Sequence, residues 1–501
     1  MNQKLKTLIK MTAGCALLGL TLAGCAVGPN YKAPDDQLAP FHNQTDASDA
    51  TSQNAPSLET WWTGFNDPQL VTVVQQALSQ NLDLAASFAR VSQARAATSG
   101  AKAALLPTVD MNASEAYEHN SLYSPFSSVS KGAPGFQRDA HESTIGPSAS
   151  WELDIFGGLR RGVAAAKDEL AAAEADNAGT RVTVTADTAD AYFQIRGYQA
   201  RIDVAEKQVS TDANLVDLIQ KRHDAGAATD REIAQATALL KNAQASVPTL
   251  RFGLEQQLNR LDVLMGVQPG TFARQLADTS DVPSIPAIPG KETPVDVLRR
   301  RPDVIAAERR LAASNEEIGQ NIASYYPKVS LSGLLGLDSL SDGHLFTANA
   351  LGAIGEGAVK WRIFDFGKID AEVAQAKGAN AEALAVYRQT VLRAAEDVED
   401  ALAGLAQTQA HVVEVQGEVD ALVKSRDLAQ EAYKAGSITL TDVLDADRQL
   451  LAAQDDLDAS RADAARAAVG VFRAFGGGWN PQSSPAAQDS AAPDANATTQ
   501  K

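Results

Sequence analysis

The longest regular pattern of apolar and polar positions in this chain predicts two very long helices. The stretch from Leu159 to His223 is almost free of proline and glycine, and in it Ile195, Ile202, Val209 and Val216 recur every seven residues. Apolar residues of a second stretch step by three, four or seven: Val398, Leu402, Leu405, Val412, Val415, Val419 and Leu422. Such spacing forms an apolar seam that a neighbouring helix must cover. At about 1.5 Å per residue, the first helix would measure roughly 100 Å.

Each long helix is expected to turn back on itself. The pattern stops near Gly226 in the first case and near Gly436 in the second, and glycine commonly ends a helix. A further helical stretch follows each glycine, at about 230–264 and 441–475. We therefore predict two helical hairpins, with their tips at the two glycines.

A different period precedes the long helices and predicts four strands. Shorter helices at about 70–104 and 302–324 stop at Pro107 and Pro327, because proline ends a helix. The segment 328–337 then alternates in polarity, and a second strand is expected at about 358–364, after a loop over 338–349. The earlier copy has its loop at 119–141. Four strands cannot close a membrane barrel, since about eight are needed, so the sheet either packs on something or several chains pool strands.

The two halves of the chain are copies of each other. The segment Trp151–Gly157 returns 210 residues later as Trp361–Gly367, and Ala225-Gly226 returns as Ala435-Gly436. Upstream of the tryptophans the offset is 220, so that Pro107 matches Pro327. A register held over so many residues indicates a tandem duplication.

The repeats and the composition between them define the expected organisation. The predicted parts are a signal peptide at 1–24, an extended lipid-anchored leader at 25–60, a first repeat at 61–266, a Pro-rich linker at 267–293, a second repeat at 294–475, and a disordered tail at 476–501. Aromatic residues make up only 6% of the chain, which suits long helices packed through small side chains. The formal charge of −18 argues against nucleic acid as a partner.

The amino terminus has the features of a lipoprotein signal. Three lysines precede a short apolar run that ends in Leu22-Ala23-Gly24-Cys25, and this run is too short to span a bilayer. The last four residues resemble a bacterial lipoprotein box, in which Cys25 becomes the first residue and carries lipid. Ala26 follows, and lipoproteins without aspartate there usually travel to the outer membrane. The alternative is an ordinary signal peptide with an incidental cysteine.

The sequence holds little sign of catalysis. The six histidines are scattered, and neither a nucleophile motif nor a phosphate-binding loop is present. We therefore predict no enzyme activity, no cofactor and no metal site. Arg299-Arg-Arg301 could form an anion site, but surface charge at a helix start is the favoured interpretation.

Two acidic residues near the second tip are candidates for a functional site. Asp442 and Asp445 are three residues apart, so they share a helix face one turn beyond Gly436. If several chains pack around an axis, such carboxylates form rings that select cations and can close a pore. The alternative is helix capping, because acids in a first turn favour the positive end of the helix dipole. The pair together favours the ring.

Motifs along most of the chain resemble the outer-membrane efflux ducts, or TolC-like outer-membrane factors, in their lipoprotein (NodT-type) branch. The resemblance runs from about Cys25 to Phe475. Its motifs are Cys25-Ala-Val-Gly-Pro-Asn-Tyr31, Trp61-Trp62 with Phe65-Asn-Asp-Pro68, Leu298-Arg-Arg-Arg-Pro-Asp303, Tyr326-Pro327, Trp361–Gly367, Tyr433-Lys-Ala-Gly436 and Asp442-Val-Leu-Asp445.

This resemblance implies a mixed α and β membrane protein of internally duplicated chains. A homotrimer would form a 12-stranded transmembrane β-barrel, with four strands from each chain, continued by a long periplasmic α-helical coiled-coil barrel. The helical tips around Gly226 and Gly436 would meet a periplasmic adaptor protein. An inner-membrane pump, commonly of the resistance-nodulation-division (RND) type, would supply energy. The protein would then be a passive exit duct for drugs or other small molecules, anchored by lipid in the outer membrane of a Gram-negative bacterium and projecting into the periplasm.

The resemblance also assigns a periplasmic gate. The family's constriction aspartates fall on Asp442 and Asp445, and a tyrosine that tethers the closed state falls on Tyr433. In the first copy the acidic position falls on Glu232, with Asp230 as a competing candidate. The tethering arginine of some members is replaced here by Ile438, which puts the tether in doubt but not the duct.

Other functions remain as alternatives to small-molecule efflux. Within the family, the alternative is a duct for type I protein secretion. From a different class, the chain could be a coiled-coil surface adhesin or spacer lipoprotein, which the paired strands and the repeat oppose. A lipoprotein enzyme is disfavoured by the absence of catalytic motifs.

Overall fold

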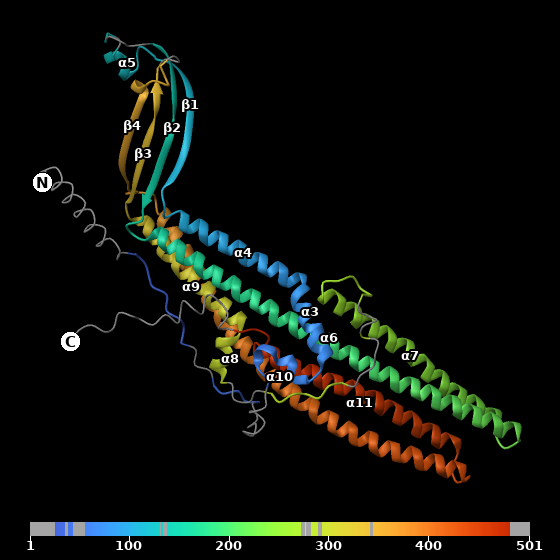
Figure 1. Ribbon diagram of the computed structural model, residues 1–501. Helices are drawn as coiled ribbons and strands as arrows, with labels where there is room; N and C mark the ends of the chain where they lie inside the picture. Colours follow the sequence, from blue (N-terminus) through green and yellow to red (C-terminus); the bar gives the residue numbers. More distant parts are fainter. Residues whose placement is uncertain are drawn as a thin grey trace, which may run out of the picture. The chain divides into compact units, whose positions relative to one another are not determined.

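The computed structural model describes residues 26–35, 39–43, 56–130, 132–133, 138–271, 276, 282–288, 293–340 and 344–480 (Figure 1). The predicted signal peptide, Cys25 and most of the expected tail lie outside the described residues, as do parts of the leader and the linker. The chain divides into two compact units, each of which draws on both repeats. The first comprises Met1–Pro34, Ser92–Leu170 and Glu308–Val386, and the second comprises Asp35–Val91, Ala171–Ala307 and Tyr387–Lys501.

The first unit contains a four-stranded antiparallel sheet in the order β1-β2-β3-β4 (Figure 1). The strands are β1 (Thr108–His119), β2 (Asp139–Leu153), β3 (Lys328–Ser339) and β4 (Leu351–Lys360). Each repeat contributes one strand pair, and β2 joins β3 across the repeats, with Trp151 opposite Leu331. The expectation of two strands per repeat is confirmed.

The fourth strand differs from its predicted position. It begins at Leu351 and ends at Lys360, before Trp361, whereas the pattern predicted a strand over 358–364. Gly352, Gly355 and Gly357 gave the segment the composition of a loop. Pairing with β3, from Leu337 opposite Leu351 to Lys328 opposite Lys360, makes it a strand nevertheless. The expected loop at 119–141 also contains a short helix, α5 (Pro125–Ser130).

The two predicted helical hairpins are present. The first consists of α6 (Gly158–Asp224) and α7 (Asp230–Leu264), and the second of α10 (Lys368–Lys434) and α11 (Leu440–Ala474). The remaining helices are η2 (Leu58–Phe65), α3 (Pro68–Gln80), α4 (Leu82–Ala103), α8 (Pro294–Arg300), α9 (Pro302–Ile322), and the short turns η3 (Ala323–Tyr325) and η4 (Ala348–Ala350). No helix within the described ranges is long and apolar enough to cross a membrane.

The helix expected over 70–104 is broken at Asn81. The backbone of this residue is extended, with ψ 130°, so α3 ends before it and α4 begins after it. Its side-chain oxygen accepts a hydrogen bond from the amide of Leu84 at 2.9 Å, which caps α4. Its side-chain nitrogen donates to the carbonyl of Leu264, at the end of α7, at 2.8 Å. The partner at Leu264 is distant in sequence, so the pattern of the segment alone did not reveal the break.

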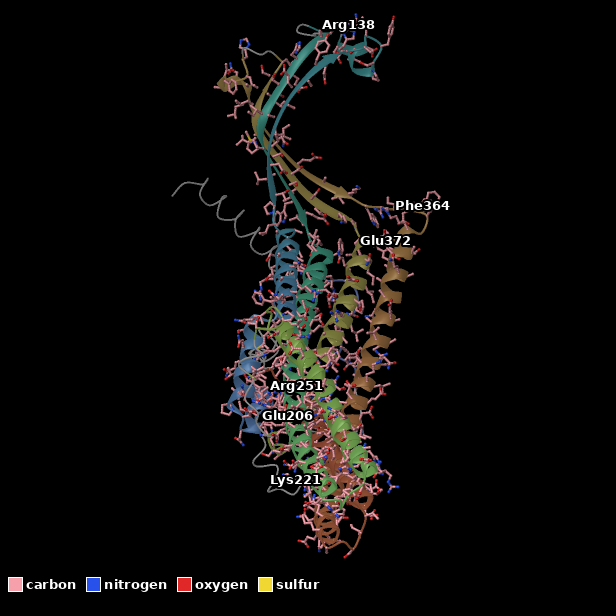
Figure 2. The ribbon with its side chains drawn as sticks, turned by 90° about the vertical axis from the view of Figure 1, so that its right-hand side faces the viewer. Arg138, Glu206, Lys221, Arg251, Phe364 and Glu372 are labelled. Atoms are coloured by element: carbon pink, nitrogen blue, oxygen red, sulfur yellow. The ribbon has the colours of Figure 1, made fainter. Side chains whose placement is uncertain are left out.

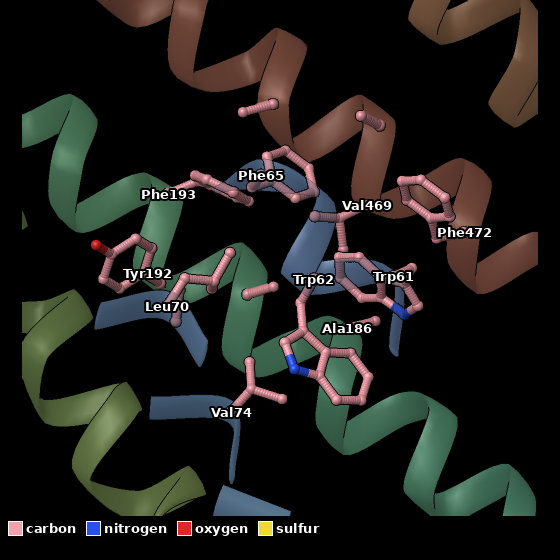
Figure 3. Packing of buried hydrophobic residues seen from close by; sticks show 14 of the residues in the cluster. Trp61, Trp62, Phe65, Leu70, Val74, Ala186, Tyr192, Phe193, Val469 and Phe472 are labelled. Atoms are coloured by element: carbon pink, nitrogen blue, oxygen red, sulfur yellow. The ribbon is translucent and has the colours of Figure 1, made fainter. Parts of the chain in front are cut away.

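The core of the second unit is built around the aromatic residues of η2 (Figure 3). Trp61 is 1% exposed and stacks on Phe472 of α11, with ring centroids 5.1 Å apart. Phe65 packs against Phe193 of α6 at 4.8 Å. Trp61, Trp62 and Phe65 are all buried, and these rings join η2 to both hairpins.

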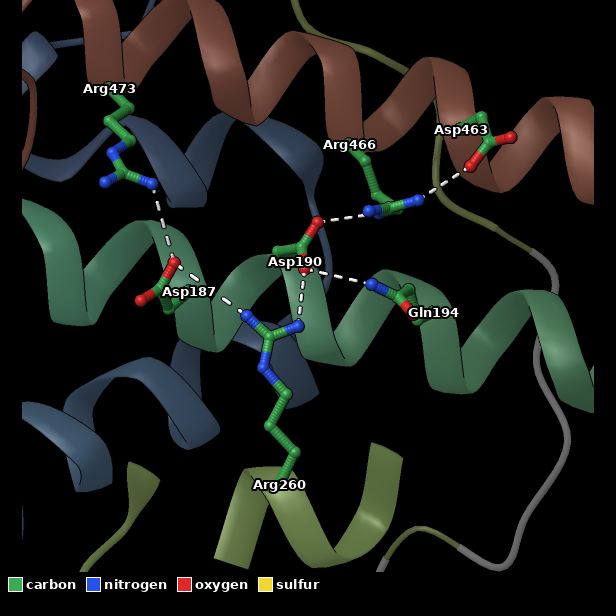
Figure 4. Close-up of polar contacts among 7 residues, drawn as sticks. All are labelled: Asp187, Asp190, Gln194, Arg260, Asp463, Arg466 and Arg473. Carbon is green, nitrogen blue, oxygen red and sulfur yellow. Dashed lines mark hydrogen bonds and ion pairs between the residues drawn. The ribbon is translucent and has the colours of Figure 1, made fainter. Parts of the chain in front are cut away.

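Ion pairs at the edge of this core connect the same helices. Asp190 of α6 contacts Arg260 of α7 at 2.8 Å and Arg466 of α11 at 2.6 Å (Figure 4). Asp187, one turn earlier, lies 3.6 Å from Arg473 of α11. Further along the first hairpin, Glu206 of α6 pairs with Arg251 of α7 at 2.6 Å (Figure 2). These partly exposed pairs add modest stability and set the pairing of the helices.

Arg301 is not part of the surface charge expected for this segment, whereas Arg299 is exposed as expected. The side chain of Arg301 is buried and forms ion pairs with Asp303 and Asp397, both at 2.7 Å. It also donates to the carbonyl of Ala474, at the end of α11, at 3.2 Å. Arg301 therefore satisfies a helix terminus and joins α9 to the second hairpin.

The described ends of the chain pack against the body. In the first unit, the guanidinium of Arg161 donates to the carbonyl of Val27 at 3.2 Å and pairs with Glu316 at 2.7 Å. In the second unit, residues 476–480 of the expected tail follow α11, and Trp479 packs against Ala178 and Val182 of α6. These five residues are thus part of the folded body rather than of a disordered tail.

Candidate functional site

The two hairpin tips share one backbone geometry. Gly226 and Gly436 have φ values of +75° and +76°, a region that L-residues other than glycine rarely occupy. The amide of Gly226 donates to the carbonyl of His223 at 2.7 Å, and the amide of Ala227 donates to that of Arg222 at 2.7 Å. Gly436 and the residue after it repeat this pattern. It is the Schellman ending of a helix, so both glycines are required by the turn itself.

Glu232 and Asp442 cap the helices that leave the two tips. The carboxylate of Glu232 accepts a hydrogen bond from the amide of Thr229 at 2.7 Å, and that of Asp442 accepts one from the amide of Thr439 at 2.8 Å. Each carboxylate also accepts from the hydroxyl of the same threonine, at 2.9 Å and 2.7 Å respectively. These are capping boxes, so the capping interpretation of Asp442 is correct as far as one chain is concerned.

These hydrogen bonds also set the protonation of the two capping acids. The hydrogen bonds from the backbone and hydroxyl of Thr229 lower the pKa of Glu232. The hydroxyl and the amide of Thr439 likewise lower the pKa of Asp442. Both side chains are exposed and carry negative charge at neutral pH.

Asp445 is placed as expected but has a different partner. It is exposed on α11, one turn after Asp442, and pairs with Arg448 at 3.0 Å. Its carboxylate is not part of the cap. Unlike Glu232 and Asp442, Asp445 therefore takes no part in capping a helix.

Tyr433 lies in an apolar cluster that joins both hairpins, here called the tip cluster. Its buried members are Ile219, Ala236, Tyr433, Leu440 and Val443. The guanidinium of Arg222 lies over the ring of Tyr433, 4.8 Å from its centroid. Ile438, which stands where some members of the family have arginine, packs against this cluster. The Tyr433 hydroxyl is buried and has no hydrogen-bond partner among the described residues.

Two buried aspartates near the tips were not predicted from the sequence. Asp212 of α6 and Asp447 of α11 are each 1% exposed. In this part of α6 the most buried positions are Ala205, Asp212 and Ile219, which also recur every seven residues, whereas Ile202, Val209 and Val216 are only half-buried. The predicted seam therefore lies beside the most buried line of this stretch rather than on it, and Val216 packs against the tip cluster. A search for acids at seven-residue spacing from apolar residues would have found Asp212.

The burial of these aspartates changes their acidity. Burial raises the pKa of Asp212 to about 6, against the effect of a hydrogen bond from Gln208, and the charge of Asp447 adds to the rise. Burial also raises the pKa of Asp447, although Arg426 opposes the shift. Within the described chain, no cluster of three or more histidines, cysteines and acids could hold a metal ion.

This chain is similar in sequence to a known protein family and to several characterised relatives. The family model described as outer membrane efflux protein matches residues 73–267 and 293–477. Nodulation protein T of Rhizobium leguminosarum bv. trifolii is 30% identical over 470 residues, which cover 92% of this chain and 96% of that protein. The pyoverdine export outer membrane protein OpmQ of Pseudomonas aeruginosa is 30% identical, with 94% of this chain and 97% of that protein covered.

Solved structures agree with these relatives. The outer-membrane channel OprN superposes with a TM-score of 0.83 at 32% identity, over 91% of this chain and all of that one. The open state of the Neisseria gonorrhoeae MtrE outer membrane channel gives a TM-score of 0.77 at 25% identity. The predicted fold class is confirmed, and with it the localisation to the outer membrane. The family match spans both repeats and thus most of the sequence, and the chain belongs to the outer membrane efflux protein family.

Proposed function

We propose that three copies of this chain form a passive exit duct for drugs or other small molecules across the outer membrane and periplasm. The observation that carries this proposal is the open sheet. Within the described chain, β1 pairs only with β2, and β4 pairs only with β3. Such exposed edges require a partner strand. If β1 of one copy pairs with β4 of the next, three copies close a barrel of twelve strands.

The exposed side chains of the sheet support its placement in lipid. Val109 and Met111 of β1 and Val359 of β4 are each 68% exposed, and the strand register places all three on the same face of the sheet. In water, so many exposed apolar residues on one sheet would favour aggregation. On the outer face of a membrane barrel they contact acyl chains instead.

The rest of the proposed assembly follows from the hairpins and the family. The helices of three copies would surround a periplasmic tunnel, and the turns at Gly226 and Gly436 would contact a periplasmic adaptor protein. An inner-membrane pump of the RND type would supply energy, and lipid on Cys25 would anchor the chain. Two relatives, the pyoverdine export outer membrane protein OpmQ and the antibiotic efflux pump outer membrane protein ArpC of Pseudomonas putida, are named for the export of small molecules, which supports such molecules as the cargo.

The proposed gate consists of Asp442 and Asp445, with Glu232 and Tyr433 beside them. Asp442 and Asp445 are exposed on α11, and three copies would present them as two acidic rings. The capping bonds of Asp442 do not conflict with a ring, because a capping carboxylate remains charged. Opening would require the tip helices to move apart when the adaptor binds.

Single-channel conductance of the purified protein in a planar bilayer tests the duct and the gate together. We expect a small, cation-selective conductance that rises or loses selectivity in the double variant Asp442→Asn/Asp445→Asn. The control is Asp217→Asn, which removes an exposed aspartate paired with Lys221 on α6 and should leave the conductance unchanged.

The outcomes separate the two parts of the proposal. If the double variant had the same conductance as the wild type, the duct would be retained, and both aspartates would have only a structural role near the start of α11. Well-folded trimers without conductance, even with the acids neutralised, would refute the duct and favour a coiled-coil adhesin or spacer.

A further inference from the structure

A cavity of about 260 Å³ lies beside the tip cluster, between α6, α10 and α11. Its walls include Asn214, Leu215 and Leu218 of α6, Tyr433 of α10, and Val443 and Asp447 of α11. Thr211, Gln430 and Lys434 complete the lining, so the walls combine three apolar side chains with neutral polar and charged ones. The volume is close to the lower limit of ordinary ligand pockets.

Asp447 occupies a position of α11 that its neighbours fill with apolar side chains. The buried residues Leu440, Val443 and Leu450 flank it at helical spacing. Neither carboxylate oxygen has a hydrogen-bond partner in the part of the chain that the structure describes. The nearest cation, Nη1 of Arg426, lies 3.8 Å away. Arg426 also pairs with Asp427 at 2.8 Å, so its charge is shared between two acids. A buried carboxylate in this position is destabilising unless a further cation compensates it.

Two other buried polar groups lie near this carboxylate. The Tyr433 hydroxyl, in the same cavity wall, has no partner within the described residues. Asp212 accepts one hydrogen bond from Gln208 at 2.8 Å, and its second oxygen has none among the residues described. Asp212, Asp427 and Arg426 lie near the Asp447 carboxylate, the exposed Lys434 lines the cavity, and Arg222 lies over the Tyr433 ring. Arg222 is engaged with that ring and Arg426 with Asp427, so among the described residues no cation comes closer than 3.8 Å to the carboxylate of Asp447.

We propose that this cavity binds the ammonium group of a small organic cation. The carboxylate of Asp447 is its counter-ion, the oxygen of Tyr433 accepts one of its hydrogen bonds, and Leu215, Leu218 and Val443 contact its alkyl part. An ammonium group has three donors and suits two or three acceptors in an apolar pocket. A divalent metal ion would require about six oxygen ligands, more than these residues offer.

The bound cation would connect the two hairpins. Its partners come from α10 and α11 of the second hairpin, and its alkyl contacts include residues of α6 in the first. Binding would therefore stabilise the arrangement of the helices seen here. This site does not depend on the proposed duct, since a chain without conductance would still bind the cation.

Calorimetric titration of the purified full chain with n-butylammonium chloride tests the site at pH 8. Sodium chloride at equal ionic strength is the reference, and the thermal midpoint is the second readout. We expect Asp447→Asn to weaken binding by about tenfold or more, because it removes a charged partner. Tyr433→Phe should weaken it by a few fold, about the contribution of one hydrogen bond. The control is Asp456→Asn, an exposed aspartate on the same helix, with unchanged affinity expected.

Each other outcome overturns the proposal. A response to n-butylammonium no greater than that to sodium, or equal binding by the wild type and Asp447→Asn, would refute the site. Loss of assembly by Asp447→Asn in a protein whose wild type binds no cation would show that the carboxylate meets a neighbouring copy instead. If Asp447→Asn did not fold, unchanged affinity of Tyr433→Phe would be decisive against the site.

Discussion

The two hairpin tips have the same backbone and different side chains. Both turn at a glycine of positive φ, both end the first helix with a Schellman motif, and both begin the second helix with a threonine and an acid in a capping box. The duplication has preserved the residues that the turn geometry requires. Apart from the capping acids, it has not preserved several of the charged residues and of the residues that fill the tip cluster.

Because of these differences, the second tip has a buried tyrosine and a buried aspartate at positions where the first tip has other residues. At the offset of 210 residues, the buried Tyr433 corresponds to the partly exposed His223, which pairs with Asp230 at 3.0 Å. The buried Asp447 corresponds to Thr237. The local backbone of the tips therefore follows from duplicated turn signals, whereas their chemistry depends on single substitutions at buried positions.

Truncation of the two corresponding side chains should show the largest difference. We expect Tyr433→Ala to destabilise the tip by about 3 kcal/mol, because a buried ring leaves a cavity. His223→Ala should cost less than about 1 kcal/mol, as is usual for a partly exposed side chain. Hydrogen exchange of amides near the tips measures the local opening free energy in each variant. Equal losses would contradict the asymmetry of the tip cluster.

Replacement of the turn glycines should instead affect both tips alike. Gly226→Ala and Gly436→Ala should each cost about 1–2 kcal/mol, since alanine is strained at positive φ. No atom lies within 4 Å of the added Cβ at either position, so sterics do not separate them. Gly417→Ala, in the interior of α10 and equally open, should be neutral or stabilising. Unequal losses at the two tips, again by hydrogen exchange, would show that the turns are not equivalent.

A smaller, pH-dependent effect should distinguish the buried acids from the capping acids. The pKa of Asp212 is raised to about 6 in the folded protein, so its ionisation opposes folding above that pH. Stability should therefore increase as the pH falls from 7.5 to 5, and Asp212→Asn should reduce this increase. The pKa of Glu232 is lowered, so its contribution is present above its unfolded pKa and is lost only at more acidic pH.

Thermal denaturation at several pH values between 7.5 and 5 measures this effect. Glu232→Gln is the control. The carboxylate of Glu232 stays charged over the whole pH range in the wild type, so its replacement should not change how the thermal midpoint varies with pH. The raised pKa of Asp212 would be contradicted if the wild-type thermal midpoint fell as the pH was lowered from 7.5 to 5 and Asp212→Asn did not change this dependence.

The sequence by itself determined the features that depend on neighbouring residues. The duplication is visible when the sequence is compared with itself. The four strands, the two long hairpins and the turns at Gly226 and Gly436 follow from local periodicity and from glycine at helix ends. Such signals act within a few residues of the chain, so they are visible without tertiary structure. The resemblance to outer-membrane efflux ducts, and the family that it implied, rest on similarly continuous motifs and are confirmed. The roles of the gate residues stay predictions.

Only the tertiary structure decided which polar residues are buried. Arg301 is enclosed because α11 ends beside it, Asn81 breaks a helix because α7 ends beside it, and the glycine-rich segment 351–360 is a strand because β3 pairs with it. Asp212 and Asp447 face the interior because helices from both repeats surround them. In each case the deciding contact joins residues far apart in the sequence. Burial then changes the energy of a charge or a hydrogen bond, and this change cannot be calculated from a residue's immediate neighbours.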